Sequence, residues 1–212
     1  MTHSDIICIG RQIGSGGLEI ARLLSQKFSI PFYDKELLEL SAKESGLSQD
    51  FLAQSDEMPS KSFFSGLPTM NLSVFSDGGL SYRGFWGSDQ LFRLQSDQIL
   101  KIASQGSSIF VGRCADYVLR EHPGMLSVFI SADHEDRLGR LQKARQLSRE
   151  DAQKLIERVD RKRSAYYNYY TYQTWGAAKT YDLCVNSSRL GIEGTAEMIA
   201  SFIRTVQARS LV

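Results

Sequence analysis

The most constraining feature of this sequence is a glycine-rich segment near the N-terminus, placed between an apolar run and an amphipathic pattern. Residues Ile6–Ile9 are apolar, and glycine fills four of the eight positions from Gly10 to Gly17. Apolar residues then recur at spacings of three and four over 20–28, which predicts a helix with one apolar face. A strand, a glycine-rich turn and a helix can together bind phosphate, because the N–H groups of the turn and the helix N-terminus attract an anion.

This segment departs from the complete P-loop pattern, G-x-x-x-x-G-K-[ST]. If Gly14, Ser15 and Gly16 form the last turn, Gly17 stands at the lysine position and Leu18 at the position of the magnesium-binding hydroxyl. From these residues alone, a tight turn without a ligand explains the segment as well as a phosphate cradle does. Residues elsewhere in the chain must decide between the two interpretations.

Length and composition favour an ordinary globular protein. The 212 residues fit one domain, with or without an insertion, and no apolar run approaches the ~20 residues that span a bilayer. The N-terminus has no signal-peptide pattern, and the spacing of the three histidines suits no metal site. Cys8, Cys114 and Cys184 each lie in or beside an apolar run, which predicts buried free thiols in a reducing cytoplasm.

Charge is balanced overall but unevenly distributed. The net charge of +1 gives no support to general nucleic-acid binding. Residues 137–163 nevertheless contain ten Lys/Arg against four Asp/Glu, whereas 34–57 contain seven Asp/Glu against two Lys. One basic segment in a nearly neutral protein favours a local anionic ligand over a long polyanion.

Apolar runs and helical patterns alternate along the chain. Short strands are predicted at 6–9, 32–33, 108–111, 126–130 and 182–186. Helices are predicted at 20–28, from about 36 to 46, 48–54, 88–105, 115–121, 134–146, 148–170 and 191–206. Ser88, Asp133 and Ser148 are the expected N-caps of three of these helices. Residues 55–88 are aperiodic and aromatic, and we interpret them as an insertion that is either a surface loop or a cover for the substrate.

The alternation predicts an α/β fold with a five-stranded parallel sheet and helices on both faces. Ligands of such sheets bind beyond the carboxyl ends of the strands. The glycine-rich segment, Asp34, Arg113 and the residues after the last two strands would meet at that edge. This convergence favours a phosphate site, although Asp34 can equally serve as a helix N-cap.

Several motifs together resemble the cytidylate kinase-like family of P-loop nucleotide kinases, and they cover nearly the whole chain apart from 55–88. They are Gly10-Arg11-Gln12-x-Gly14-Ser15-Gly16-Gly17, Pro31–Leu37, Gly112-Arg113-x-Ala115-Asp116-Tyr117, Arg158-x-Asp160-x-x-Arg163 with Tyr166–Tyr170, Tyr181–Cys184 and Leu190–Gly194. The resemblance implies a P-loop-type three-layer fold with a core (1–34 and 106–212), a monophosphate-binding or insertion region (about 35–105) and a lid (about 146–176), all in one domain.

The resemblance also implies an activity and roles for individual residues. The activity would be phosphoryl transfer from ATP, with Mg²⁺, to CMP or dCMP. The residues implied to bind ATP are Gly10, Arg11, Gln12, Gly14, Ser15, Gly16 and Gly17. Asp34, Arg113 and Asp116 would bind the acceptor, and Arg11, Arg158, Arg161 and Arg163 would act in catalysis. Arginines suit this chemistry because their planar groups grip phosphate oxygens in pairs.

Departures from the family pattern keep other functions open. Because position 17 holds no lysine, the positive charge that the lysine would supply must come from Arg11 or from a lid arginine. If neither supplies it, the protein is a nucleotide-binding module without activity. A kinase for another small acceptor is a second alternative. The aromatic and basic stretch around Tyr166–Tyr172 suggests single-strand binding, which the net charge disfavours. We expect a cytoplasmic protein that interacts with nucleotides and with no membrane, and we leave a homodimer open.

Overall fold

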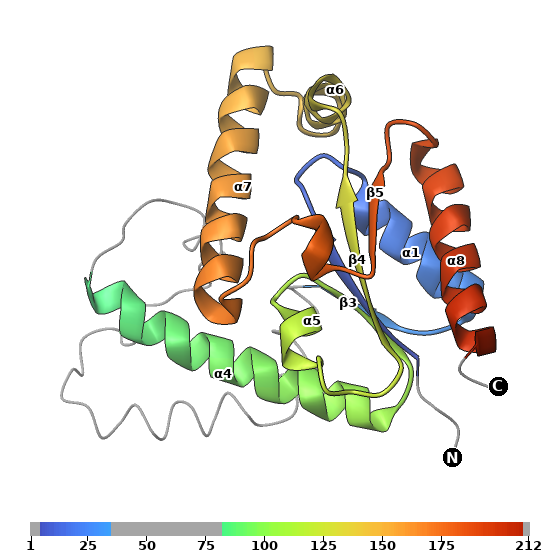
Figure 1. The fold of residues 1–212 in the computed structure, drawn as a ribbon. Helices are drawn as coiled ribbons and strands as arrows, with labels where there is room; N and C mark the ends of the chain where they lie inside the picture. Colours follow the sequence, from blue (N-terminus) through green and yellow to red (C-terminus); the bar gives the residue numbers. More distant parts are fainter. Residues whose placement is uncertain (1–4, 35–81, 210–212) are drawn as a thin grey trace, which may run out of the picture.

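The computed structural model describes residues 5–34 and 82–209, which form a parallel sheet with helices on both faces (Figure 1). The strands are β1 (Ile6–Arg11), β2 (Phe32–Tyr33), β3 (Ser108–Val111), β4 (Met125–Ser131) and β5 (Leu183–Asn186). They pair in the order β2-β3-β1-β4-β5, and every pairing is parallel. The predicted fold class is therefore confirmed.

The helices follow the strands in the predicted order. They are α1 (Gly17–Phe28), α4 (Tyr82–Gln105), α5 (Ala115–Val118), α6 (His134–Arg145), α7 (Arg149–Thr171) and α8 (Gly191–Arg209), with a short 3₁₀ helix at Ala178–Thr180. Ser148 caps α7 as predicted, because its hydroxyl accepts a hydrogen bond from the Asp151 N–H at 3.1 Å. Among the described helices, none is long and apolar enough to cross a membrane.

The two faces of the sheet explain the apolar runs. Alternate residues of β1 face opposite ways: Ile7 and Ile9 pack in the cluster with α1 and α8, and Ile6 and Cys8 pack in the cluster with α4 and α5. A strand that is buried on both faces has no polar alternation, which is the usual pattern of a parallel sheet. The carboxyl ends of the strands are thus left as the edge where a ligand can bind.

Helices α6 and α7 form a third packing region at that edge. Figure 1 shows α6 end-on above the upper end of β4, with α7 upright on its left and the turn from β1 into α1 below it. Their shared apolar cluster contains Leu138 and Leu141 of α6, Ala152 and Ile156 of α7, and Ile13 of the glycine-rich segment. The segment is therefore anchored on this helical pair by its own side chain.

Some local predictions are wrong. Helix α4 begins at Tyr82 and not at Ser88, because the helix runs through Gly84 and Gly87, whose low propensity masked the pattern. Helix α5 ends at Val118 and not at 121, since the following N–H groups of Arg120 and His122 bond carbonyls three residues back, as in turns.

Two side chains also differ from expectation. The carboxylate of Asp133 does not cap α6, because it accepts a hydrogen bond from Asn186 Nδ2 at 2.7 Å instead. Cys184 is exposed, whereas Cys8 and Cys114 are buried as predicted, and all three thiols are free. The helices predicted at 36–46 and 48–54, and the insertion up to residue 81, lie outside the described residues.

Candidate functional site

The glycine-rich segment turns sharply between β1 and α1, and its glycines are required by both backbone and packing. Gly14 and Gly16 have φ angles of 75° and 78°, in the left-handed region that other residues rarely adopt. A Cβ atom on Gly14 would lie 2.9 Å from the backbone oxygen of Arg137, and one on Gly16 would collide with Ile192. At these two positions the turn is thus packed too tightly against α6 and α8 for a side chain.

The backbone amides of this turn are available to a ligand. The N–H groups of Gly14, Gly16, Gly17 and Leu18 have no hydrogen-bond partner in the described part of the chain. Successive unpaired amides at a helix N-terminus form a concave donor surface that suits phosphate oxygens.

The carbonyl groups of the same turn are bound by arginines. Arg163 Nη1 donates to the Arg11 oxygen at 2.9 Å, Arg137 Nε to the Ile13 oxygen at 2.8 Å, and Arg140 Nη1 to the Gly14 oxygen at 3.1 Å. Because these carbonyls are held by α6 and α7, the backbone keeps one orientation and its amides stay available.

Asp160 and Ser187 complete this support. The Asp160 carboxylate accepts a hydrogen bond from the Ile13 N–H at 3.0 Å and forms an ion pair with the buried Arg137. Ser187, after β5, donates from its hydroxyl to the Ser15 oxygen at 2.7 Å and accepts from Arg140 at 3.2 Å. The segment is therefore held from α6, α7 and the end of β5 together.

Arg11 lies where a side chain at position 17 would otherwise begin. A Cβ atom on Gly17 would stand 2.7 Å from Arg11 Cβ and 3.0 Å from its Cγ, and one on Gly112 would collide with the guanidinium group. The Arg11 side chain thus runs across the start of α1 to the end of β3. Glycine at position 17 and arginine at position 11 are structurally coupled.

The guanidinium groups at this edge form a positive cluster. Burial, together with the charges of Arg163 and Arg113, lowers the pKa of Arg11 to about 9, although Asp34 acts in the opposite direction. Burial likewise lowers the pKa of Arg163. Arginine nevertheless stays protonated at neutral pH. Asp160 opposes the lowering of the Arg163 pKa, whereas Arg113, Arg137 and Arg145 add to it. Guanidinium groups therefore outnumber the carboxylates of Asp34 and Asp160 at this edge, which makes it electrostatically suited to an anion.

Arg113 extends from a strained turn. Gly112, Arg113 and Cys114 follow one another with φ angles of 80°, 60° and 55°, and such conformations persist only where the surroundings enforce them. The Arg113 guanidinium carbon lies 5.8 Å from the centre of the Tyr166 ring. The turn thus holds the Arg113 side chain near Arg11 and next to the Tyr166 ring of α7.

Asp116 is engaged within the protein. Tyr167 donates its hydroxyl hydrogen to the Asp116 carboxylate at 2.6 Å, beneath the aromatic cluster that also contains Phe129 and Tyr181. Burial raises the pKa of Asp116, and the Tyr167 hydrogen bond partly offsets this effect.

The remaining predicted groups support the glycine-rich segment. Gln12 accepts from the Ala132 N–H at 3.3 Å, and Gly10 allows close approach of Phe129 and Tyr181.

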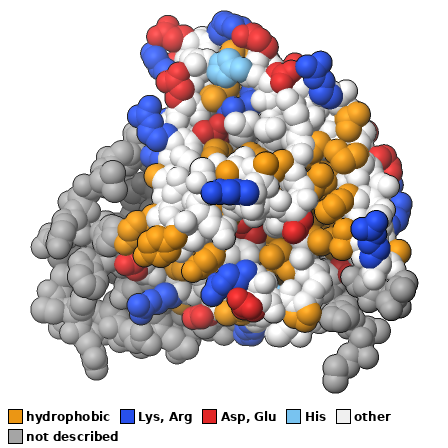
Figure 2. Space-filling view, in the orientation of Figure 1, with side chains coloured by type: hydrophobic (Ala, Val, Ile, Leu, Met, Phe, Trp, Pro, Cys, Tyr) orange, Lys and Arg blue, Asp and Glu red, His pale blue; other side chains and the backbone are white. Residues whose placement is uncertain are grey.

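The arginines of α7 divide into two sets. Arg163 reaches the glycine-rich segment, whereas Arg158 and Arg161 are exposed on the helix, and Arg158 lines a shallow groove with Arg145 and Lys154. Figure 2 shows acidic and basic side chains mixed over α6 and the first turns of α7, as on an ordinary solvated surface. The structure therefore brings one of the three lid arginines to the site.

Sequence reasoning missed Arg137 and Arg140, included Ser187 only among the residues after the last strand, and gave Asp160 no role although it stood in a recognised motif. The available signal was the concentration of arginine over 137–163.

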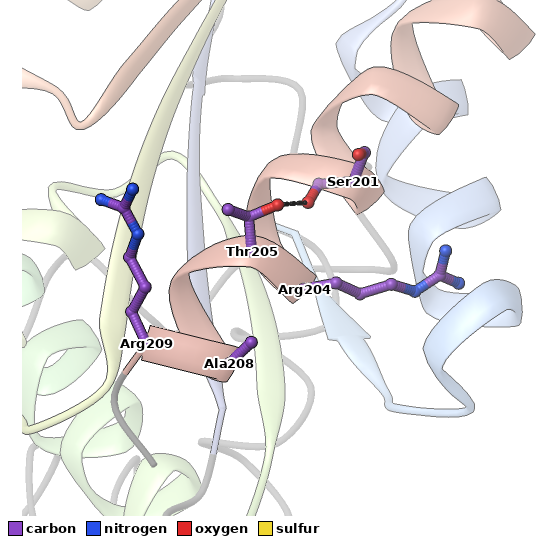
Figure 3. A pocket seen from close by; sticks show the side chains of 5 residues that line it. All are labelled: Ser201, Arg204, Thr205, Ala208 and Arg209. Carbon is purple, nitrogen blue, oxygen red and sulfur yellow. Dashed lines mark hydrogen bonds between the residues drawn. The ribbon is translucent and has the colours of Figure 1, made fainter. Parts of the chain in front are cut away.

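In the described ranges, no group of three His, Cys, Asp or Glu side chains could hold a metal ion. Another groove, over the last turns of α8, is lined by Ser201, Arg204, Thr205, Ala208 and Arg209 (Figure 3), at the opposite end of the sheet from the glycine-rich segment.

Comparison with known proteins identifies the family. The model of the cytidylate kinase-like family matches residues 6–189. The chain belongs to that family. No curated protein matches its sequence.

Solved structures agree with this assignment at the level of the fold. An uncharacterized protein from Eubacterium ventriosum ATCC 27560 is 26% identical, with a TM-score of 0.68 over 94% of this chain and 98% of its own. TT1252 from Thermus thermophilus is 18% identical, with a TM-score of 0.57 over the same shares. A shikimate kinase from Bacteroides thetaiotaomicron is 13% identical, with a TM-score of 0.50 over 94% of this chain and 98% of its own. The fold and family are thus those of kinase-type phosphotransferases.

Proposed function

We propose that this protein transfers the γ-phosphoryl group of ATP to the phosphate of CMP or dCMP, yielding ADP and CDP or dCDP. The observation that carries the proposal is the cluster of Arg11, Arg113 and Arg163 next to the unpaired amides of the glycine-rich segment. Family membership supports a nucleotide substrate. Together they support a site for two phosphate-bearing ligands.

In this proposal the unpaired amides of Gly14, Gly16 and Gly17 bind the ATP phosphates, and Arg11 supplies the charge that a P-loop lysine would bring. The coupling of Arg11 to Gly17 supports this assignment, because the arginine fills the space beside the helix start. The turn offers no hydroxyl at position 18, so Mg²⁺ would be held mainly by phosphate oxygens and water.

Arg113 holds the acceptor phosphate, with Asp34 at the same strand edge. An acceptor phosphate oxygen is already a nucleophile, so the protein needs no strong base, and positioning with charge neutralisation is enough. In this proposal Arg163, whose charge acts on both Arg11 and Arg113, neutralises the negative charge that shifts during transfer. Arg158 and Arg161 would contribute to catalysis only if α7 changed its position.

The free thiols and the absence of a membrane-spanning helix in the described ranges are compatible with the cytoplasmic location that we propose. A homodimer remains a prediction, to be tested by the molar mass in solution.

The direct test combines binding and turnover. ATP·Mg²⁺ and CMP are titrated separately by calorimetry, and ADP release is then measured with both present. We expect both ligands to bind, and we expect Arg11→Met to lower kcat/KM by roughly 10²–10³-fold, the typical loss for one charge contact in the transition state. An Arg22→Met variant, at an exposed position of α1, is the matched control.

Two outcomes would contradict the proposal in different ways. Binding of both nucleotides without ADP release would indicate a nucleotide-binding protein without kinase activity. ADP release with another small acceptor, but not with CMP or dCMP, would leave a kinase and refute the acceptor.

A further inference from the structure

Gln95 is a buried polar residue of α4 whose hydrogen-bonding capacity is only partly used. Its side chain is 3% exposed, and its Oε1 atom accepts a hydrogen bond from the Tyr166 hydroxyl at 3.4 Å. Its Nε2 atom is buried and has no partner in the described part of the chain. If the two ends of the amide were exchanged, the oxygen would be the unpaired atom instead, so one polar end lacks a partner in either orientation.

An unpaired buried amide is unfavourable, because the group loses its hydrogen bonds to water and gains none in return. A hydrophobic side chain at this position would avoid that cost, since the neighbouring Ile99 and Ile102 of α4 are buried in the apolar core. A buried polar group without a partner therefore needs an explanation, and a ligand that completes its hydrogen bonds is one.

Tyr166 connects Gln95 to the acceptor side of the proposed site. Its hydroxyl contacts Gln95, while its ring lies 5.8 Å from the guanidinium carbon of Arg113. Burial raises the pKa of Tyr166, so its hydroxyl remains a neutral donor. Gln95 is thus one side chain away from the arginine that we assign to the acceptor phosphate.

Aromatic rings surround this chain of contacts. Phe92, three residues before Gln95 on α4, stacks on Tyr170 with ring centres 4.1 Å apart, and lies edge-on to Tyr166 at 6.3 Å. Tyr170 in turn donates to Asp89 at 2.8 Å. Phe92 and Tyr170 stack face to face on each other, so they fix the positions of Tyr166 and Gln95, and the Gln95 amide is the group left to hydrogen-bond a ligand ring.

We infer that Gln95 determines acceptor specificity, by hydrogen bonding to the ring of a molecule whose phosphate is bound by Arg113. Because Nε2 is the unpaired atom in the structure, the partner atom on that ring is an uncharged carbonyl oxygen or ring nitrogen, as pyrimidine nucleotides carry. This inference deepens the proposed function and rests on it.

The test compares Gln95→Met with Gln105→Met, the same change at an exposed position of α4. Three ligands are titrated by calorimetry: CMP, ribose 5-phosphate, which has the sugar and phosphate without a ring base, and ATP·Mg²⁺. We expect Gln95→Met to weaken CMP binding roughly ten-fold, as for one lost hydrogen bond to a buried group. Binding of ribose 5-phosphate and ATP should change by less than about two-fold, and Gln105→Met should change none of the three.

Thermal unfolding without ligand separates specificity from a structural role. Because Gln95→Met removes an unpaired polar group, the unfolding temperature should stay unchanged or rise. A lower unfolding temperature, with CMP and ribose 5-phosphate weakened equally, would show a structural role and overturn the inference. Unchanged CMP binding would overturn it as well.

The proposed function can fail separately. If the wild-type protein binds CMP without releasing ADP, the kinase activity is refuted, while selective weakening in Gln95→Met still supports ring recognition. If the wild-type protein binds no CMP but releases ADP with an acceptor that lacks a ring base, the inference is refuted and phosphoryl transfer stands.

Discussion

Two helical regions contact the glycine-rich segment, and they do so by different physical means. Helix α8 contacts it through Ile192 against Gly16, and its inner face completes the core with Ile199 and Ile203. Helices α6 and α7 also pack on Ile13, but in addition they bind the backbone of the segment through Arg137, Asp160 and other charged groups. Apolar packing is non-directional and mainly stabilises, whereas ion pairs and hydrogen bonds fix the orientation of individual groups. We therefore expect changes in α8 to affect folding alone, and changes at the charged groups of α6 and α7 to affect ligand binding as well as folding.

The largest expected effect on stability is at the apolar inner face of α8. Ile199→Ala removes most of a fully buried side chain, and should lower the free energy of unfolding by about 4 kcal/mol. The measurement is urea unfolding, with Ser201→Ala at an exposed position of α8 as control. Below the denaturation range, ATP affinity should be unchanged; a large loss of affinity would contradict the division between the two regions.

The next largest effect is expected at the ion pair between α6 and α7. Asp160→Asn keeps an oxygen to accept from the Ile13 N–H, but it leaves the buried Arg137 without an opposite charge. We expect a loss of about 3 kcal/mol in the free energy of unfolding, together with weaker ATP binding. The control is Glu157→Gln, which also replaces a carboxylate on α7 but at an exposed position. Unaltered ATP affinity would mean that Asp160 serves only stability.

Two arginines of α7 allow a comparison within a single helix, because one contacts the glycine-rich segment and the other is exposed. Arg163→Met should lower kcat/KM by roughly 10²-fold, because this guanidinium group holds the Arg11 carbonyl and belongs to the positive cluster. Arg161→Met, at an exposed position two residues earlier, should change kcat/KM by less than about two-fold. Steady-state ADP release measures both. Equal losses in the two variants would show that α7 moves so that Arg161 also reaches the site.

The smallest effect concerns Asp116 and is seen only as a pH dependence. Because burial raises the pKa of Asp116 in the folded protein, ionisation disfavours folding as the pH rises from about 4 through the raised value. Asp116→Asn should therefore raise the unfolding temperature at pH 7, relative to wild type, and give little change at pH 4. Asp97→Asn, at an exposed position, provides the control. A lower unfolding temperature of Asp116→Asn at pH 7 would show that the Tyr167 hydrogen bond outweighs the cost of burying the carboxylate.

Much of the fold could be predicted because local patterns and long-range packing agree. The apolar runs at β1, β3 and β4 are buried on both faces, and the periodic residues of α1 and α8 face the sheet. The prediction failed where local propensity was weak, as at Gly84 and Gly87 of α4. Asp133 stands at the N-cap position of α6 as predicted, but its carboxylate accepts from Asn186 and makes no capping hydrogen bond to the helix.

The candidate site was predictable in outline but not in its partners. Parallel strands bring their carboxyl ends together, so the glycine-rich segment, Asp34 and Arg113 were expected at one edge. The arginines presented a different problem, because a basic helix has the same composition whether its side chains face solvent or backbone carbonyls. Arg163 and Arg161 are two residues apart, and only the packing of α7 distinguishes them.

The sequence by itself determined the parallel α/β fold, the glycine-rich turn at its carboxyl edge and the resemblance to cytidylate kinase-like proteins, because periodicity and glycine placement are local properties. Only the tertiary structure decided that Arg11 crosses Gly17, that Arg137, Arg140 and Arg163 bind the carbonyls of the turn, and that Gln95 lies behind Tyr166 with an unpaired amide. The physical reason is that a side chain's partners depend on which elements pack together, and residues far apart in the sequence make those contacts.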